Sequence, residues 1–140
     1  MCRTPDNGDG ASSSVHDVAA ILDFTDAVNS YVVMDVAIAI VQMSIHCPYE
    51  TQLDVGGHIL SGYYKYSTLN EAEKKSLKTL MCARLCQCLV FGAHAYAKQP
   101  WNDYILTTSR KGRPLLQKLW EIDHKELYRR WDSIIDAYKH

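Results

Sequence analysis

Three of the five cysteines in this 140-residue sequence lie close together and could bind a metal or act as nucleophiles: Cys82, Cys86 and Cys88. On a helix, Cys82 and Cys86 share one face while Cys88 points elsewhere. Zinc sites commonly use two cysteines separated by two residues, and this spacing does not occur. The odd number of cysteines and the awkward geometry of a disulfide along one helix indicate free thiols in a reducing compartment. We therefore expect core packing for these cysteines, with no metal and no cofactor.

A second candidate for chemistry is the adjacent pair His46 and Cys47. Neighbours along a chain rarely present a nucleophile and a base to each other, and no third orienting residue is recognisable. The sequence also lacks a glycine-rich phosphate loop, a His-Glu-x-x-His metal motif and a nucleophile elbow. We therefore predict no catalytic residue and a protein that is not an enzyme.

Arg84 is the only charged residue between Leu80 and Tyr96. Its guanidinium could form a forked contact with a carboxylate of an incoming helix. Alternatively, it could begin a helix and extend its charged end into solvent. The residues by themselves leave both interpretations open.

The elements that would position these residues are almost all helical. Apolar residues recur at helical spacing over residues 15–28, from Tyr31 to about Ile45, and from Glu50 to about Tyr66. The Cys47-Pro48 pair is expected to end the second of these helices. Asn70 is expected to cap a further helix that reaches Lys98.

From Leu77 to Lys98 the sequence is apolar nearly all round, which predicts a central helix surrounded by other helices. Two shorter helices are expected after Pro100, with a turn between them at the basic cluster Arg110, Lys111 and Arg113. Asp123 is a plausible cap for the last helix. The pattern predicts an all-α fold of about six to eight helices around one central hydrophobic helix.

Composition narrows the class of protein further. The first 14 residues are polar and contain glycine, proline and serine, so we expect a disordered leader over 1–14 and one domain over 15–140. A formal net charge of −1 argues against a nucleic-acid partner. No signal peptide and no run of about 18 uncharged apolar residues is present. A soluble protein without a membrane span is therefore predicted.

Three short segments resemble the homology motifs of the Bcl-2 family, in the chain order of that family. Leu53–Tyr64 resembles the third motif, the BH3 segment. Met81–Gly92 resembles the first motif, in which Arg84 opens the central helix, and Trp131–Tyr138 resembles the second motif. The residues that carry the matches are Leu53, Gly57, Leu60, Tyr64, Arg84, Phe91, Gly92, Trp131 and Tyr138.

The resemblance is closest to viral members of the family, such as those of fish iridoviruses. It implies an inhibitor of apoptosis that holds the BH3 helix of a narrow range of pro-apoptotic proteins, such as Bim, Bak or Bax. The exposed apolar surface of such a groove further predicts a homodimer. We also expect a location in the host cytoplasm, with recruitment to mitochondria by partners. The implied groove residues are Arg84, Leu53, Gly57, Leu60, Tyr64, Leu85 and Cys88, and the implied structural residues are Phe91, Gly92, Trp131 and Tyr138.

The sequence departs from the family pattern at several positions. His58 stands where the family usually has aspartate, and it is either an ordinary surface histidine or a pH-sensitive contact. Arg129 and Arg130 replace a pair of glycines. Two alternative functions therefore remain: a viral inhibitor of innate immune signalling that acts through other surfaces, or a helical scaffold that only self-associates.

Overall fold

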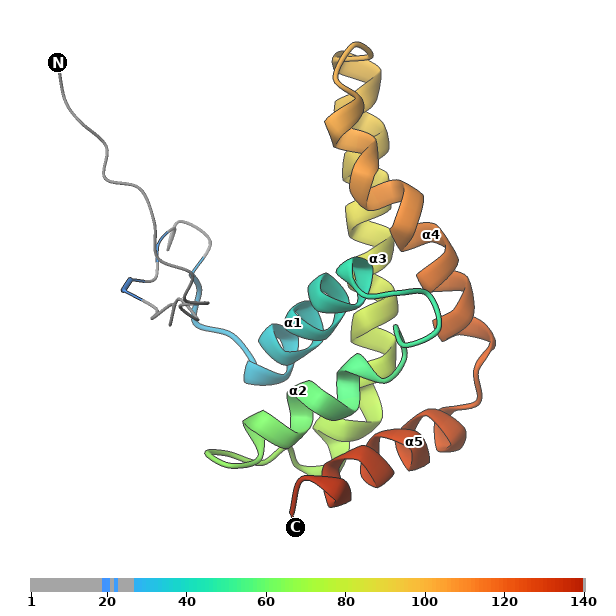
Figure 1. The fold of residues 1–140 in the computed structure, drawn as a ribbon. Helices are drawn as coiled ribbons and strands as arrows, with labels where there is room; N and C mark the ends of the chain where they lie inside the picture. The colour runs from blue at the N-terminus through green and yellow to red at the C-terminus, as the bar shows by residue number, and fades with distance from the viewer. Residues whose placement is uncertain (1–18, 21, 23–26, 140) are drawn as a thin grey trace, which may run out of the picture.

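The computed structural model describes residues 19, 20, 22 and 27–139, and every regular element among them is helical (Figure 1). The elements are α1 (Val32–His46), α2 (Val55–Tyr63), α3 (Glu71–Lys98), the 3₁₀ turn η1 (Asp103–Ile105), α4 (Leu106–Glu121) and α5 (His124–Ala137). The predicted all-α class is confirmed. In the described part of the chain, five α-helices form instead of the six to eight expected.

Local signals determine where most of these helices begin and end. α1 ends at His46, directly before the Cys47-Pro48 pair that was expected to stop it. At the start of α3 the Asn70 side chain accepts a hydrogen bond from the Glu73 amide at 2.9 Å, and the Glu73 carboxylate accepts one from the Asn70 amide at 2.8 Å. Asp123 caps α5 by accepting hydrogen bonds from the amides of Lys125 and Glu126. The predictions of both caps are confirmed.

The core lies where α1, the first half of α3, the second half of α4 and α5 meet (Figure 1). α1 contributes a buried stripe at helical spacing that includes Val33, Val36 and Ile40. The large side chains that are fully buried in the core are Trp131, Ile40, Ile45, Leu77, Met81, Leu85, Leu115, Leu119 and Leu127. α2 is short and packs mainly against α5 and α1.

The prediction that α3 is surrounded over its whole apolar length is wrong. Its buried residues are Leu77, Met81, Cys82 and Leu85, all in the first half. Beyond Leu85, α3 pairs with the start of α4 in a two-helix hairpin that projects away from the other helices (Figure 1). No residue from 86 to 111 is buried. Apolar sequence was therefore not sufficient to predict burial.

The basic cluster also lies in a different setting from the one predicted. Arg110, Lys111 and Arg113 lie inside α4, which runs continuously through Gly112 and Pro114. Proline removes one backbone hydrogen bond from a helix interior. The helix nevertheless continues because the next turns bury Leu115 and Leu119 completely. The expected turn is therefore a continuous segment of helix.

The helix that is expected over residues 15–28 lies mostly outside the described residues. Its described residues, 19, 20, 22, 27 and 28, are not helical. The expected leader, residues 1–14, lies outside the described residues. Among the described residues, α3 is the one helix whose length and composition would allow it to cross a membrane, with a mean hydropathy of 1.2 over 18 residues. Because its first half belongs to the core, the fold is compatible with a soluble protein.

Candidate functional site

The seven residues assigned to a ligand groove do not line one groove. Leu60 and Tyr64 line a cavity of about 530 Å³ between α2, the start of α3 and α5. Arg84 lines a different cavity of about 280 Å³ between α1 and α3. Leu85 is fully buried in the core and Cys88 is half-buried farther along α3. The remaining two residues, Leu53 and Gly57, lie in the contact between α2 and α5.

The segment that resembles the BH3 motif packs α2 against α5. The indole nitrogen of Trp131 donates a hydrogen bond to the Leu53 carbonyl at 2.7 Å. A Cβ added at Gly56 would lie 2.3 Å from the Trp131 ring, and one added at Gly57 would lie 2.8 Å from Ile134. These glycines are therefore explained by close approach of the two helices, because a larger residue would not fit there.

An ion pair joins the same two helices beside the buried tryptophan. The Nη2 atom of Arg130 lies 3.0 Å from Oδ2 of Asp54, and its Nε atom bonds the other carboxylate oxygen. The hydrogen bond from Arg130 holds the pKa of the Asp54 carboxyl below its usual value. Both side chains lie near the surface, so the contribution to stability is modest. Arg130 thus has a structural role, which explains an arginine at this position.

Arg84 has a partner within its own helix. Its Nη1 atom donates a hydrogen bond to Oε1 of Gln87 at 2.7 Å. Its Nε atom is buried and has no hydrogen-bond partner among the described residues. The adjoining cavity is lined mainly by apolar side chains, namely Met34, Ala37, Ile38, Leu80 and Ala83. Arg84 therefore lies at the edge of a small apolar hollow, apart from Leu60 and Tyr64.

The remaining residues named from the sequence occupy different environments. Trp131 is 1% exposed in the core, whereas Phe91 lies on the outer surface of the hairpin. Gly92 lies where α3 approaches Ser109 of α4. Tyr138 is exposed, and its hydroxyl oxygen lies 3.0 Å from Nδ1 of His58. His58 therefore bonds within the chain.

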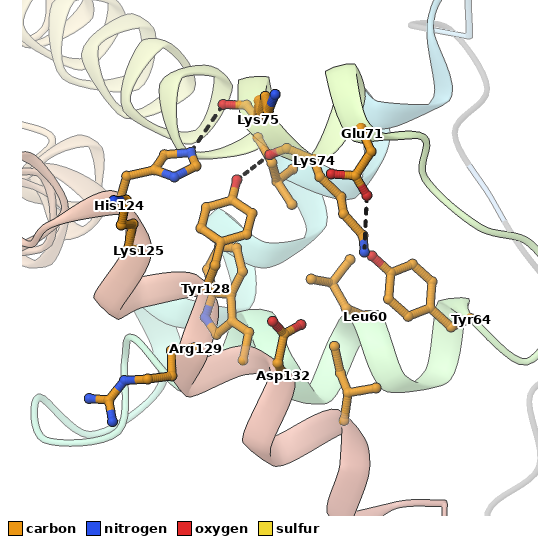
Figure 2. A pocket seen from close by; sticks show the side chains of 13 residues that line it. Leu60, Tyr64, Glu71, Lys74, Lys75, His124, Lys125, Tyr128, Arg129 and Asp132 are labelled. Atoms are coloured by element: carbon orange, nitrogen blue, oxygen red, sulfur yellow. Dashed lines mark hydrogen bonds and ion pairs between the residues drawn. The ribbon is translucent and has the colours of Figure 1, made fainter.

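The cavity between α2, α3 and α5 is a candidate site lined by charged and aromatic side chains (Figure 2). Its charged lining residues are Glu71, Lys74, Lys75, Lys125, Arg129 and Asp132. The Lys74 ammonium lies 4.0 Å from the Glu71 carboxylate, as the dashed line in Figure 2 shows. Four basic and two acidic groups would favour an anionic or zwitterionic small molecule.

Two of the uncharged polar side chains of this cavity, Tyr128 and His124, already bind the backbone (Figure 2). The Tyr128 hydroxyl donates a hydrogen bond to the Lys74 carbonyl, and Nε2 of His124 lies 3.3 Å from the Lys75 carbonyl oxygen. The two rings stack with centroids 4.2 Å apart. Burial raises the pKa of the Tyr128 hydroxyl to about 12, so the group stays protonated and neutral. Tyr128 and His124 therefore fasten α5 to α3, and no nucleophile–base pair forms between them.

Comparisons with known proteins find relatives that are named hydroxylysine kinase. No family model and no solved structure matches the chain. It is 42% identical over 119 residues to a hydroxylysine kinase of Danio rerio, a match that covers 84% of this chain and 33% of the relative. Over 130 residues it is 35% identical to hydroxylysine kinase of Mus musculus, covering 92% of this chain and 34% of that protein. The chain spans about a third of the length of the curated relatives it matches.

These relatives overturn the resemblance to the Bcl-2 family. The predicted inhibition of apoptosis, the capture of BH3 helices by a viral protein and the alternative of blocked immune signalling are wrong. The expectation that the protein is not an enzyme is also wrong, because the relatives are named as enzymes. Two of the three misleading motifs, Leu53–Tyr64 and Trp131–Tyr138, are small sets of residues whose spacing reflects tight packing of α2 on α5. Over most of its length the chain is instead similar to one third of a hydroxylysine kinase.

Proposed function

We propose that this chain forms a helical part of a kinase that phosphorylates the side-chain hydroxyl of hydroxylysine. The observation that carries the proposal is the 42% identity over 119 residues to the Danio rerio relative. In this reaction the substrate oxygen bonds the γ-phosphorus of a nucleoside triphosphate, the bond to the β-phosphate breaks, and the hydroxyl proton is released. The expected soluble, cytoplasmic location is part of this proposal, because both substrates are soluble molecules.

The described residues supply only part of what such a reaction needs. Kinases hold the phosphates with backbone amides, a lysine and metal-binding acids. Here the paired glycines, Gly56 and Gly57, are buried against Trp131 and Ile134 and are not free to bind phosphate. Within the described part of the chain no three His, Cys, Asp or Glu residues gather to hold a metal ion. A nucleotide-binding part must therefore come from other residues.

One short sequence pattern outside the described residues fits a kinase. Asp23-Phe24-Thr25 follows the apolar residues Ala19 to Leu22 and is the only Asp-Phe pair in the chain. In protein kinases an Asp-Phe-Gly sequence provides an aspartate that binds magnesium. Thr25 replaces the glycine, so the match covers two residues of three. The pair is a sequence signal for a kinase, and we propose Asp23 as a magnesium ligand in such an enzyme.

The proposal is tested in a chimera in which this chain replaces the matching third of the Danio rerio relative. We expect transfer of the γ-phosphoryl group from ATP or GTP to hydroxylysine, and none to lysine, which lacks the hydroxyl. Asp23→Asn should lower the rate at least about 100-fold, a loss typical of removing one group that stabilises charge in the transition state. Asp35→Asn, on the exposed face of α1, is the matched control and should leave the rate unchanged. A folded chimera that does not phosphorylate hydroxylysine would refute the proposal.

A further inference from the structure

The hairpin of α3 and α4 exposes a set of large apolar side chains. Val90 and Phe91 on α3 are each 63% exposed, and Trp101 and Tyr104 beyond the end of α3 are 80% and 83% exposed. Cys86, one turn before Val90, is exposed as well. We call these five residues the hairpin face. Large apolar side chains that gather exposed on one part of a folded protein can mark a contact with another molecule or domain.

The second half of α3 has the composition of a helix that packs against other parts of a protein. From Leu85 to Ala97 the sequence contains no Asp, Glu, Lys or Arg. A helix side that faces water normally carries charged residues. Of its exposed residues, Cys86, Val90, Ala93 and Ala97 recur at spacings of three and four and so form an apolar stripe, beside the exposed polar residues Gln87 and His94. This apolar stripe is therefore better suited to a contact with another surface than to solvent.

The hairpin does not need this stripe for its own packing. α3 and α4 approach each other through small residues on the opposite side, where a Cβ added at Gly92 would lie 3.0 Å from Oγ of Ser109. Gly112 of α4 similarly faces Leu85 and Leu89 of α3. The five residues of the hairpin face stay exposed beside this inner contact and are available to bind another surface.

We propose that the hairpin face is the docking surface for the rest of a hydroxylysine kinase-like fold, the part that corresponds to the uncovered two thirds of the relatives. This inference rests on the proposed function. Two observations support this occupant: the chain spans only 33% of the Danio rerio relative, and it lacks a phosphate-binding loop of its own. A lipid bilayer fits less well, because Arg110 and Lys111 are exposed on the same hairpin and are costly to bury in lipid.

The test is co-expression of the full 140-residue chain with a tagged polypeptide made of the residues of the Danio rerio relative that the match leaves uncovered. We expect the two to co-purify in a 1:1 complex. Val90→Asp with Phe91→Asp should reduce the recovered chain at least tenfold. Thr107→Asp, an exposed position on α4 outside the hairpin face, is the matched control and should leave recovery unchanged. Unchanged circular dichroism of both variants alone would show that they fold.

A second measurement uses the thiol of Cys86, which is exposed in the isolated chain. In the complex its alkylation by N-ethylmaleimide, followed by peptide mass spectrometry, should slow at least tenfold. The half-buried Cys47, away from the hairpin, should keep its rate. The docking proposal is overturned if no complex forms, if the double variant still co-purifies fully, or if the chain instead self-associates or floats with phosphatidylcholine vesicles. A complex that forms but does not phosphorylate hydroxylysine would refute the proposed function and leave the docking proposal standing.

Discussion

The contact between Gly56 and Trp131 allows a stability prediction in which two opposing effects can be weighed. In a helix, replacing glycine by alanine ordinarily stabilises by about 0.8–1 kcal/mol. At position 56, however, the new Cβ would lie 2.3 Å from Cε2 and 2.4 Å from Cζ2 of Trp131. The ring cannot move freely, because it is 1% exposed and its nitrogen is bonded to the Leu53 carbonyl at 2.7 Å.

Steric conflict should therefore outweigh the gain in helix propensity. Overpacking a core typically costs about 1–3 kcal/mol, and weakening the Trp131 hydrogen bond costs about 0.5–1.5 kcal/mol. We expect Gly56→Ala to lower the free energy of unfolding by about 1–3 kcal/mol, or the melting temperature by roughly 4–12 °C. Urea denaturation followed by circular dichroism measures the change.

The same helix offers a matched control at Gly62, where an added Cβ would meet nothing within 4 Å. Gly62→Ala should stabilise by about 0.5–1 kcal/mol, because only the propensity term remains. In a Trp131→Phe background, which removes the ring atoms nearest position 56, Gly56→Ala should cost at least about 1 kcal/mol less than in the wild type. If Gly56→Ala were as stable as Gly62→Ala, the close packing of α2 on α5 would be refuted.

Three further predictions concern the caps, the core and the ion pair. Asn70→Ala should destabilise by about 1 kcal/mol in urea denaturation, because it removes the capping box of α3, and an unchanged midpoint would contradict that role. Leu85→Ala should cost about 2–5 kcal/mol, since the side chain is fully buried, and a loss below 1 kcal/mol would place it at the surface. Asp54→Asn should cost about 0.5–1 kcal/mol at neutral pH, a small value because the Arg130 side chain is 42% exposed. Since the pKa of Asp54 is lowered in the folded state, this contribution is present above the unfolded-state pKa of about 3.9 and is lost as the pH falls below it. The stabilities of the wild type and Asp54→Asn should therefore converge in acid, and a constant difference down to pH 2 would exclude the ion pair as its source.

Local chemistry in the sequence determined the helical class and several helix boundaries. Asn70 with Glu73, Asp123 and the Cys47-Pro48 pair act through the backbone groups of their own turn, so they are readable without knowledge of the fold. The same local reasoning failed at Gly112 and Pro114, which lie inside α4. There the burial of Leu115 and Leu119 against other helices outweighs the cost of the two helix breakers.

The assignment of function failed for a related reason. The types and spacing of Leu53, Gly57 and Trp131 resemble short motifs and so predict parts of a ligand groove and its support. Only the tertiary structure shows that this pattern arises from the contact of α2 with α5. A few residues at helical spacing do not reveal whether their partner is another helix of the same chain or a separate molecule, since both contacts require the same shapes.

Burial of the apolar residues was likewise decided only in three dimensions. The sequence from Leu77 to Lys98 is apolar throughout, yet α3 is buried to Leu85 and uncovered beyond it. The hydrophobicity of a side chain favours its burial, but it does not specify the surface against which the side chain packs. In this chain the first half of α3 is covered by α1 and α4, while the second half exposes Val90 and Phe91, because none of the described helices extends far enough to cover them.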